Sequence, residues 1–183
     1  MNETLKIIEK RYSCRDYKSE EIADKILQAI AKAAVQAPSG INRQPWRVIV
    51  VKDKDLMKDM EEAAMSHLAS IDDKSTYERI MGRGGKLFYN APCMIVVPVD
   101  SHSAMIDCGI VCQNIALAAT SLGVDNVICG LTRNVFTNEA NRKEFSKRLG
   151  FPEGYEFGCS VLLGYANTVK EPHEPDMGKI TFI

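Results

Sequence analysis

Three side chains near the start of the chain, Arg11, Ser13 and Arg15, have the types and spacing of an anion-binding site. In an extended segment, residues two apart point to the same side, so two guanidinium groups and a hydroxyl can face one ligand. Arginine suits phosphate because its planar fork donates two parallel hydrogen bonds. Arginines are also common on solvated surfaces, so this segment alone leaves a surface role beside a helix end open.

A second segment, residues 38–46 with the sequence PSGINRQPW, offers a different chemistry. Pro38, Ser39 and Gly40 form a rigid turn, and Asn42 and Gln44 then place amide groups two residues apart. Amides and free backbone N–H groups are suitable partners for the polar edges of a planar heterocycle. The same residue types also occur in an ordinary loop between a helix and a strand.

The elements that must position these segments follow from hydrophobic periodicity. Helices are predicted at residues 2–10, 19–37, 53–71, 75–89, 103–122 and 138–149. Apolar, β-branched runs predict strands at residues 46–51, 94–99, 126–129 and 156–163. Strands separated by helices indicate an α/β or α+β sandwich with helices on both faces of a central sheet.

Both segments resemble motifs of the nitroreductase family. Residues 11–17 resemble its R-x-S-x-R-x-[FY] segment, and residues 38–46 resemble its P-S-x-x-N-x-Q-P-W segment one helix later. Asn90-Ala91-Pro92 before a strand, Asp107 with residues 113–119 on the long central helix, and Gly164-Tyr165 also fit the family pattern. The similarity covers nearly the whole chain, which we expect to form one FMN-binding domain over residues 1–183. It implies an α+β fold with a mainly antiparallel sheet and a C-terminal strand exchanged with a partner subunit.

The resemblance also assigns residues to FMN. It implies that Arg11, Tyr12, Ser13 and Arg15 hold the cofactor, and that Pro38, Ser39, Gly40 and Asn42 reach the same flavin from the partner. Gln44 is also an expected cofactor-binding residue. Ile128, Cys129, Gly130 and Leu131 match the strand end that faces flavin N5. Family members place Arg or Lys-x-Arg in the tail, whereas this tail has no Arg, and Lys179 is the expected second phosphate cation. Arg83 and Lys86 are candidates for the pyrimidine edge.

Composition excludes other classes of function. The chain has 183 residues, a net charge of −1 and scattered basic residues, so nothing favours nucleic acid or a membrane surface. The N-terminal ten residues lack a signal-peptide apolar block, and we expect a cytoplasmic protein. The six cysteines form no C-x-x-C pair, so we expect buried thiols and no metal site.

The expected function is an oxidoreductase that passes electrons from NAD(P)H through FMN to small acceptors such as nitroaromatics or quinones. No side-chain nucleophile is expected, because the flavin carries the chemistry. Two alternatives remain open: an FMN-binding store without turnover, and a specialised flavoenzyme of the same fold that resembles reductive dehalogenases. We also expect a homodimer, because the helix at residues 103–122 is apolar on more than one face.

Overall fold

A four-stranded sheet forms the centre of the computed structural model, which describes residues 2–183. The strands lie in the order β1-β2-β4-β3, and each neighbouring pair is antiparallel. Their bounds are β1 Ile49–Val51, β2 Cys93–Val99, β3 Asp125–Ile128 and β4 Glu156–Gly164. The predicted α+β class with a mainly antiparallel sheet is therefore confirmed.

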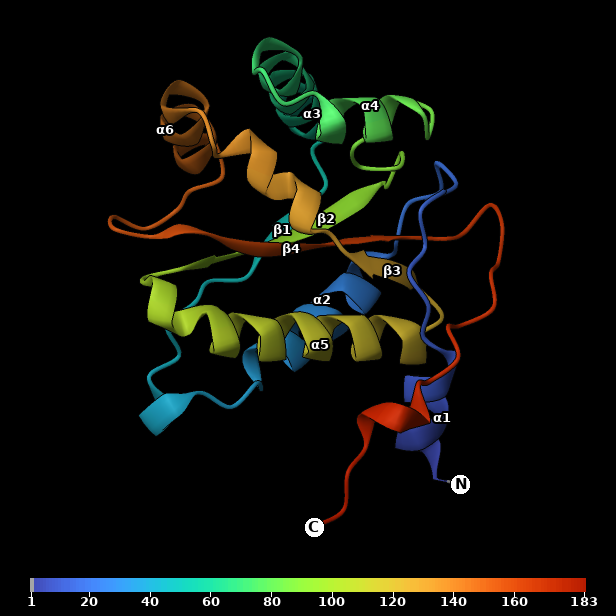
Figure 1. The fold of residues 1–183 in the computed structure, drawn as a ribbon. Helices are drawn as coiled ribbons and strands as arrows, with labels where there is room; N and C mark the ends of the chain where they lie inside the picture. Colours follow the sequence, from blue (N-terminus) through green and yellow to red (C-terminus); the bar gives the residue numbers. More distant parts are fainter. Residues whose placement is uncertain (1) are drawn as a thin grey trace.

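Helices cover both faces of this sheet (Figure 1). One face carries α2 (Asp24–Val35) and α5 (Met105–Ser121), and α1 (Glu3–Lys10) packs against α5. The other face carries α3 (Lys54–Ser70), α4 (Ser75–Met81) and α6 (Glu139–Arg148). The chain thus has three layers, with the sheet between two sets of helices.

Strand β2 supplies side chains to the hydrophobic cores on both faces. All seven of its residues are buried. Met94 and Val96 pack into the core beneath α3, whereas Ile95 and Val97 pack into the core against α2 and α5. The alternation follows from the two-residue period of a strand, and burial on both faces explains why β2 is a continuous apolar run.

Helix α5, with the turn before it, is long and apolar enough to cross a membrane by length and composition. Its Val111, Cys112 and Ile115 are buried in the core that α5 shares with the sheet and α2. A helix that packs on several sides inside a folded chain has the same composition. The apolar character of α5 is therefore explained by this packing.

Several element boundaries differ from the predictions. The helix predicted from Ser19 begins at Asp24, because residues 18–23 form an irregular segment with a bend at Ser19, and Lys18 N donates to the Tyr165 carbonyl at 2.8 Å. The helix predicted to reach Tyr89 ends at Met81, where a glycine-rich turn with left-handed Gly84 and Gly85 follows.

The strand predicted at residues 46–51 is also shorter than expected. Trp46 makes only an isolated bridge to Val99, and β1 starts at Ile49. Arg47 N donates to the Pro98 carbonyl of β2 at 3.1 Å, but Pro98 has no N–H to donate in return, so the ladder is incomplete there. The C-terminal residues 180–183 form no strand within the described chain, so the predicted strand exchange stays a prediction.

The segment at residues 11–17 is anchored along the edge of the sheet. Ser13 forms a parallel bridge with Asn126, and Cys14 N donates to the Asn126 carbonyl at 3.0 Å. The buried Tyr17 hydroxyl donates to the Cys14 carbonyl at 3.1 Å and lies 3.3 Å from the Leu162 carbonyl. A Cβ at Gly164 would lie 2.7 Å from the Tyr17 ring, so only glycine leaves room for this anchor.

We therefore expect Tyr17→Phe to lower the free energy of unfolding by about 1 kcal/mol, because a buried hydrogen-bond donor is lost. Burial raises the pKa of Tyr17, so the phenol stays a donor at neutral pH. Tyr155→Phe is the matched control, since Tyr155 packs its ring under Arg47 and its hydroxyl makes no hydrogen bond to the described residues. Urea unfolding measures both variants, and equal stability loss in the two would contradict the anchoring role.

Candidate functional site

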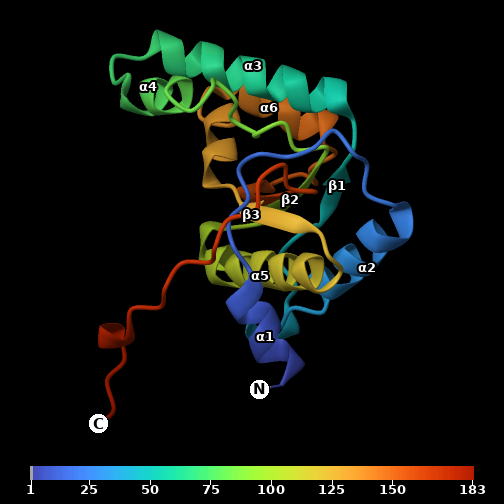
Figure 2. The ribbon, with the colours of Figure 1, turned by 90° about the vertical axis from the view of Figure 1, so that its right-hand side faces the viewer.

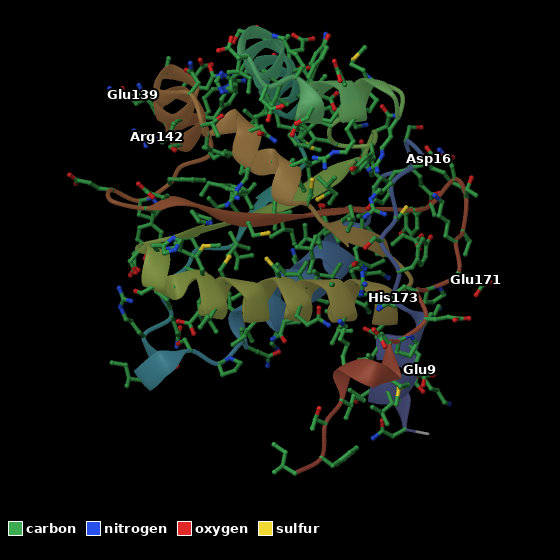
Figure 3. All side chains as sticks on the ribbon, in the orientation of Figure 1. Glu9, Asp16, Glu139, Arg142, Glu171 and His173 are labelled. Atoms are coloured by element: carbon green, nitrogen blue, oxygen red, sulfur yellow. The ribbon has the colours of Figure 1, made fainter. Side chains whose placement is uncertain are left out.

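The predicted anion-binding side chains surround one cavity of about 300 Å³. Arg11, Ser13 and Arg15 line it together, as their two-residue spacing predicts. The tail contributes Lys170 and His173 to the opposite wall. Figure 3 shows His173 on the tail, at the same side of the view as Asp16, whereas Arg142 lies on α6 at the opposite side. We call this space the basic cavity.

The charges in the basic cavity are available to a ligand. Arg15 is exposed, and Arg11 and Ser13 are half-buried. Arg15 Nη1 lies 3.5 Å from the Ser13 carbonyl, which is a weak contact. Neither Arg11 nor Arg15 forms an ion pair with any residue between 2 and 183. Glu171 is the acidic side chain on the wall, so the cavity carries a net positive charge.

Tyr12 lies beside this cavity and directs its phenol inward. The hydroxyl is buried and has no hydrogen-bond partner within the part of the chain that the structure describes. Burial, together with the nearby Asp125 carboxylate, raises the pKa of Tyr12. The phenol is therefore neutral, and its polar neighbours are the Asp125 carboxylate and the Cys14 thiol of the same chain.

A second cavity, of about 320 Å³, lies at the end of β3, and we call it the strand-end cavity. Its wall includes the predicted residues Ile128, Cys129, Gly130 and Leu131. Arg15 lines this cavity as well as the basic cavity, so the two spaces share a wall. An elongated ligand with an anionic end and a planar end can occupy both.

Cys129 is the nearest thiol to this space, but it is not a reactive group. The residue is buried, and burial raises the pKa of its thiol. The Ser160 hydroxyl donates to the Cys129 carbonyl at 3.1 Å and contacts the Thr132 hydroxyl at 2.7 Å. These contacts fix the backbone just before Gly130, which is the first residue of the short 3-10 helix η3 (Gly130–Val135).

Two further arginines reach the strand-end cavity from α4 and the turn after it. Arg83 was a candidate from the sequence, and the structure places it on the wall beside Arg79. Sequence reasoning missed Arg79, which lies in the last turn of α4, where a basic residue has an ordinary explanation. Lys86, the other candidate, lies elsewhere, 3.9 Å from Glu61.

The predicted amide loop lies apart from both cavities within the single chain. Gly40 N is 3.4 Å from the Asp107 carboxylate near the start of α5, and Arg43 forms a 2.8 Å ion pair with Asp100. The lining of the two cavities contains none of Pro38, Ser39, Gly40, Asn42 or Gln44. The chain alone therefore does not bring this loop to Arg11, Ser13 and Arg15.

The backbone of this loop is strained. Ile41, Asn42 and Gln44 have positive φ angles of 48°, 56° and 51°, a region that side chains with a Cβ rarely adopt. Gln44 N donates to the Ser39 hydroxyl at 2.9 Å, and the Gln44 amide donates to Asn42 at 3.0 Å. Ile41 is 98% exposed. Such strain is often found where a loop contacts a ligand or a partner.

Lys179 is distant from the basic cavity. It lies in the short 3-10 helix η4 (Met177–Lys179), on a tail that leaves the body of the chain (Figure 2). The cavity wall contains Lys170 and not Lys179. Between residues 2 and 183, no group of three or more His, Cys, Asp or Glu side chains is arranged to hold a metal ion.

Comparison with known proteins identifies the family. A sequence model described as the nitroreductase family matches residues 8–165. The chain belongs to the nitroreductase family. A nitroreductase with bound FMN from Desulfitobacterium hafniense is 63% identical, with a TM-score of 0.97, and the match covers 100% of this chain and 99% of that one.

Two further relatives support the assignment to the nitroreductase family. A nitroreductase with bound FMN from Bacteroides fragilis is 28% identical over 100% of both chains, with a TM-score of 0.91. A protein of Bacillus subtilis named FMN reductase [NAD(P)H] is 41% identical, over 96% of this chain and 71% of its own length. The resemblance found in the sequence motifs is therefore confirmed.

Proposed function

We propose that this nitroreductase binds FMN across the basic and strand-end cavities and transfers electrons from NADH or NADPH to a small acceptor in the cytoplasm. The observation that carries the proposal is Arg15, which lines both cavities. FMN has an anionic phosphate at one end and a planar ring at the other, and the joined cavities offer matching surroundings. The relatives with bound FMN support the same cofactor.

Different side chains contact different parts of the cofactor in this proposal. Arg11, Ser13 and Lys170 line the basic cavity and suit the phosphate, because they supply two cations and a hydroxyl. Within one chain Lys170 replaces Lys179 in this role, since Lys179 lies outside the cavity. Arg15 places a cation beside the ring, and the Gly130 N–H is the donor proposed for N5. The neutral Cys129 thiol leaves that region free of a competing anion.

The bound FMN supplies the two-electron chemistry. For a quinone acceptor, one NAD(P)H and one proton yield one NAD(P)⁺ and one hydroquinone, which balances hydrogen and charge. The protein has to hold each reactant in turn over the same ring face, and it has to stabilise negative charge on the reduced ring. Arg15 serves the second need, because a nearby cation favours an anionic ring edge.

We also propose that the functional unit is a homodimer. Exposed apolar side chains occur on α1 (Leu5 and Ile8), on α5 (Ile106, 79% exposed) and on the amide loop (Ile41). Exposed apolar side chains of this size are of the kind that mark a protein interface. The amide loop is far from the cavities of its own chain, so it can contact FMN only from a partner. A dimer therefore completes two equivalent sites.

The cofactor proposal is tested on the purified protein. We expect one FMN per subunit, identified by its absorbance and by the mass of the released ligand. We expect Arg11→Ala to weaken FMN binding about tenfold or more, because a charge-assisted hydrogen bond is lost, with a smaller effect on hydride transfer in the FMN-saturated enzyme. Arg142→Ala on α6 is the control for loss of an exposed arginine. FAD in place of FMN, or an unchanged affinity in Arg11→Ala, would contradict the proposal.

Oxidation of NADH or NADPH with menadione as acceptor separates an enzyme from a flavin store. Steady turnover supports the proposed function. A yellow protein that binds FMN but oxidises neither nucleotide would be a store.

The dimer is tested by removing residues 181–183, which include Phe182, 95% exposed in the single chain. We expect the deletion to loosen both the dimer and FMN binding, because an apolar end that docks on the partner is lost. Light scattering gives the mass of the parent and the deleted chain, and FMN titration gives the affinity. A parent protein that is monomeric and fully loaded with FMN would rule out the model.

A further inference from the structure

The strand-end cavity carries more positive charge than FMN requires. Arg15, Arg79 and Arg83 line it, and no acidic side chain belongs to its wall. The chain as a whole has a net charge of −1, so this concentration of one sign is local. A cleft lined by one sign of charge focuses the field and favours a ligand of the opposite sign.

Arg79 and Arg83 have no ion-pair partner within the described residues, in contrast to Arg43 and Arg148. Arg148 pairs with Asp59 at 2.7 Å, and Arg43 pairs with Asp100 at 2.8 Å. Glu78 adjoins Arg79 in the sequence but does not line the cavity. Both side chains are exposed and able to meet a ligand that enters from solvent.

A structural role explains only part of this arrangement. Arg79 lies in the last turn of α4, where a cation interacts favourably with the helix dipole. Arg83 lies beyond that helix, in the turn that includes the left-handed Gly84 and Gly85. The helix dipole therefore does not explain why Arg83 lies on the same cavity wall as Arg79 and Arg15.

The remaining charges point to a ligand other than FMN. On the proposed function, Arg11 and Lys170 match the phosphate, and Arg15 matches the reduced ring. Arg79 and Arg83 are then left over beside Gly130, at the place where the acceptor has to meet the ring. We propose that these two arginines bind an anionic group of the electron acceptor, a carboxylate in the simplest case. This inference rests on the proposed function, and it adds that the preferred electron acceptor is an anion.

The guanidinium group suits this task because its fork can bond both oxygens of a carboxylate. The acceptor is thus a small conjugated compound that carries a negatively charged group in addition to the group to be reduced. Neutral nitroaromatics and quinones remain substrates, but they lack the contact that the two arginines provide.

A pair of acceptors of nearly equal size tests the proposal: 4-nitrobenzoate, which is anionic, and 4-nitrobenzamide, which is neutral. The kcat/KM of each is measured with the FMN-loaded protein and saturating NADH or NADPH. In the double variant Arg79→Ala/Arg83→Ala we expect the ratio of kcat/KM for 4-nitrobenzoate to kcat/KM for 4-nitrobenzamide to fall about fivefold or more. The reason is that each exposed charge pair contributes a factor of roughly two to five to the binding of the anion. Arg79→Lys/Arg83→Lys should recover part of the ratio, since the charge remains.

Arg142→Ala is the control, because it removes one exposed arginine on α6 that lines neither cavity. Its ratio should equal that of the parent protein. Calorimetry gives a second readout that does not depend on turnover. It measures the affinity of the oxidised, FMN-loaded protein for benzoate, with benzamide as the neutral comparison. We expect benzoate to bind more weakly to the double alanine variant.

Three results would overturn the inference. The first is a ratio that does not change in the double variant. The second is a rise in KM for NADPH or NADH in place of the change in ratio, which would assign the arginines to the nucleotide. The third is weaker FMN binding with the ratio intact, which would assign them to the cofactor. A protein without FMN or without NAD(P)H turnover would instead refute the proposed function, so the two failures are distinguishable.

Discussion

The backbone pairing between residues 11–17 and the edge of the sheet is the constraint on which the site depends. The bridge from Ser13 to Asn126 holds the segment extended, and Tyr17 fixes its far end against Cys14 and Leu162. In an extended chain, alternate side chains face opposite sides. Cys14 is therefore buried, while Arg11, Ser13 and Arg15 remain on the outside, where they line the basic cavity.

Local patterns in the sequence were sufficient for those features that depend on nearby residues. The two-residue spacing of Arg11, Ser13 and Arg15 predicted that they share one side, and the structure places them around one cavity. The continuous apolar run at residues 94–99 predicted a strand, which the structure has at Cys93–Val99. The family resemblance then supplied the mainly antiparallel character of the sheet, which no local pattern contains.

Features that depend on distant contacts were not predictable from such patterns. The start of β1 depends on Pro98, a residue of a strand more than forty residues away that lies opposite Arg47 and has no N–H to donate. Lys170 and His173 reach the basic cavity because the tail folds back along the N-terminal segment, whereas sequence reasoning selected Lys179. Arg79 was missed because a basic residue in the last turn of a helix has an ordinary explanation.

The double burial of β2 has a consequence for how the chain can be divided. Met94 and Val96 belong to one core and Ile95 and Val97 to the other, so a single strand joins the two. Its neighbours β1 and β4 come from opposite sides of it in the sequence. A break in the chain between α4 and β2 would separate α2, α3 and β1 from the other three strands, which would keep only α5 on one face and α6 on the other. Neither fragment retains both the β2 strand and the helices α2 and α3 that cover it, so each would expose part of a core that the intact chain buries.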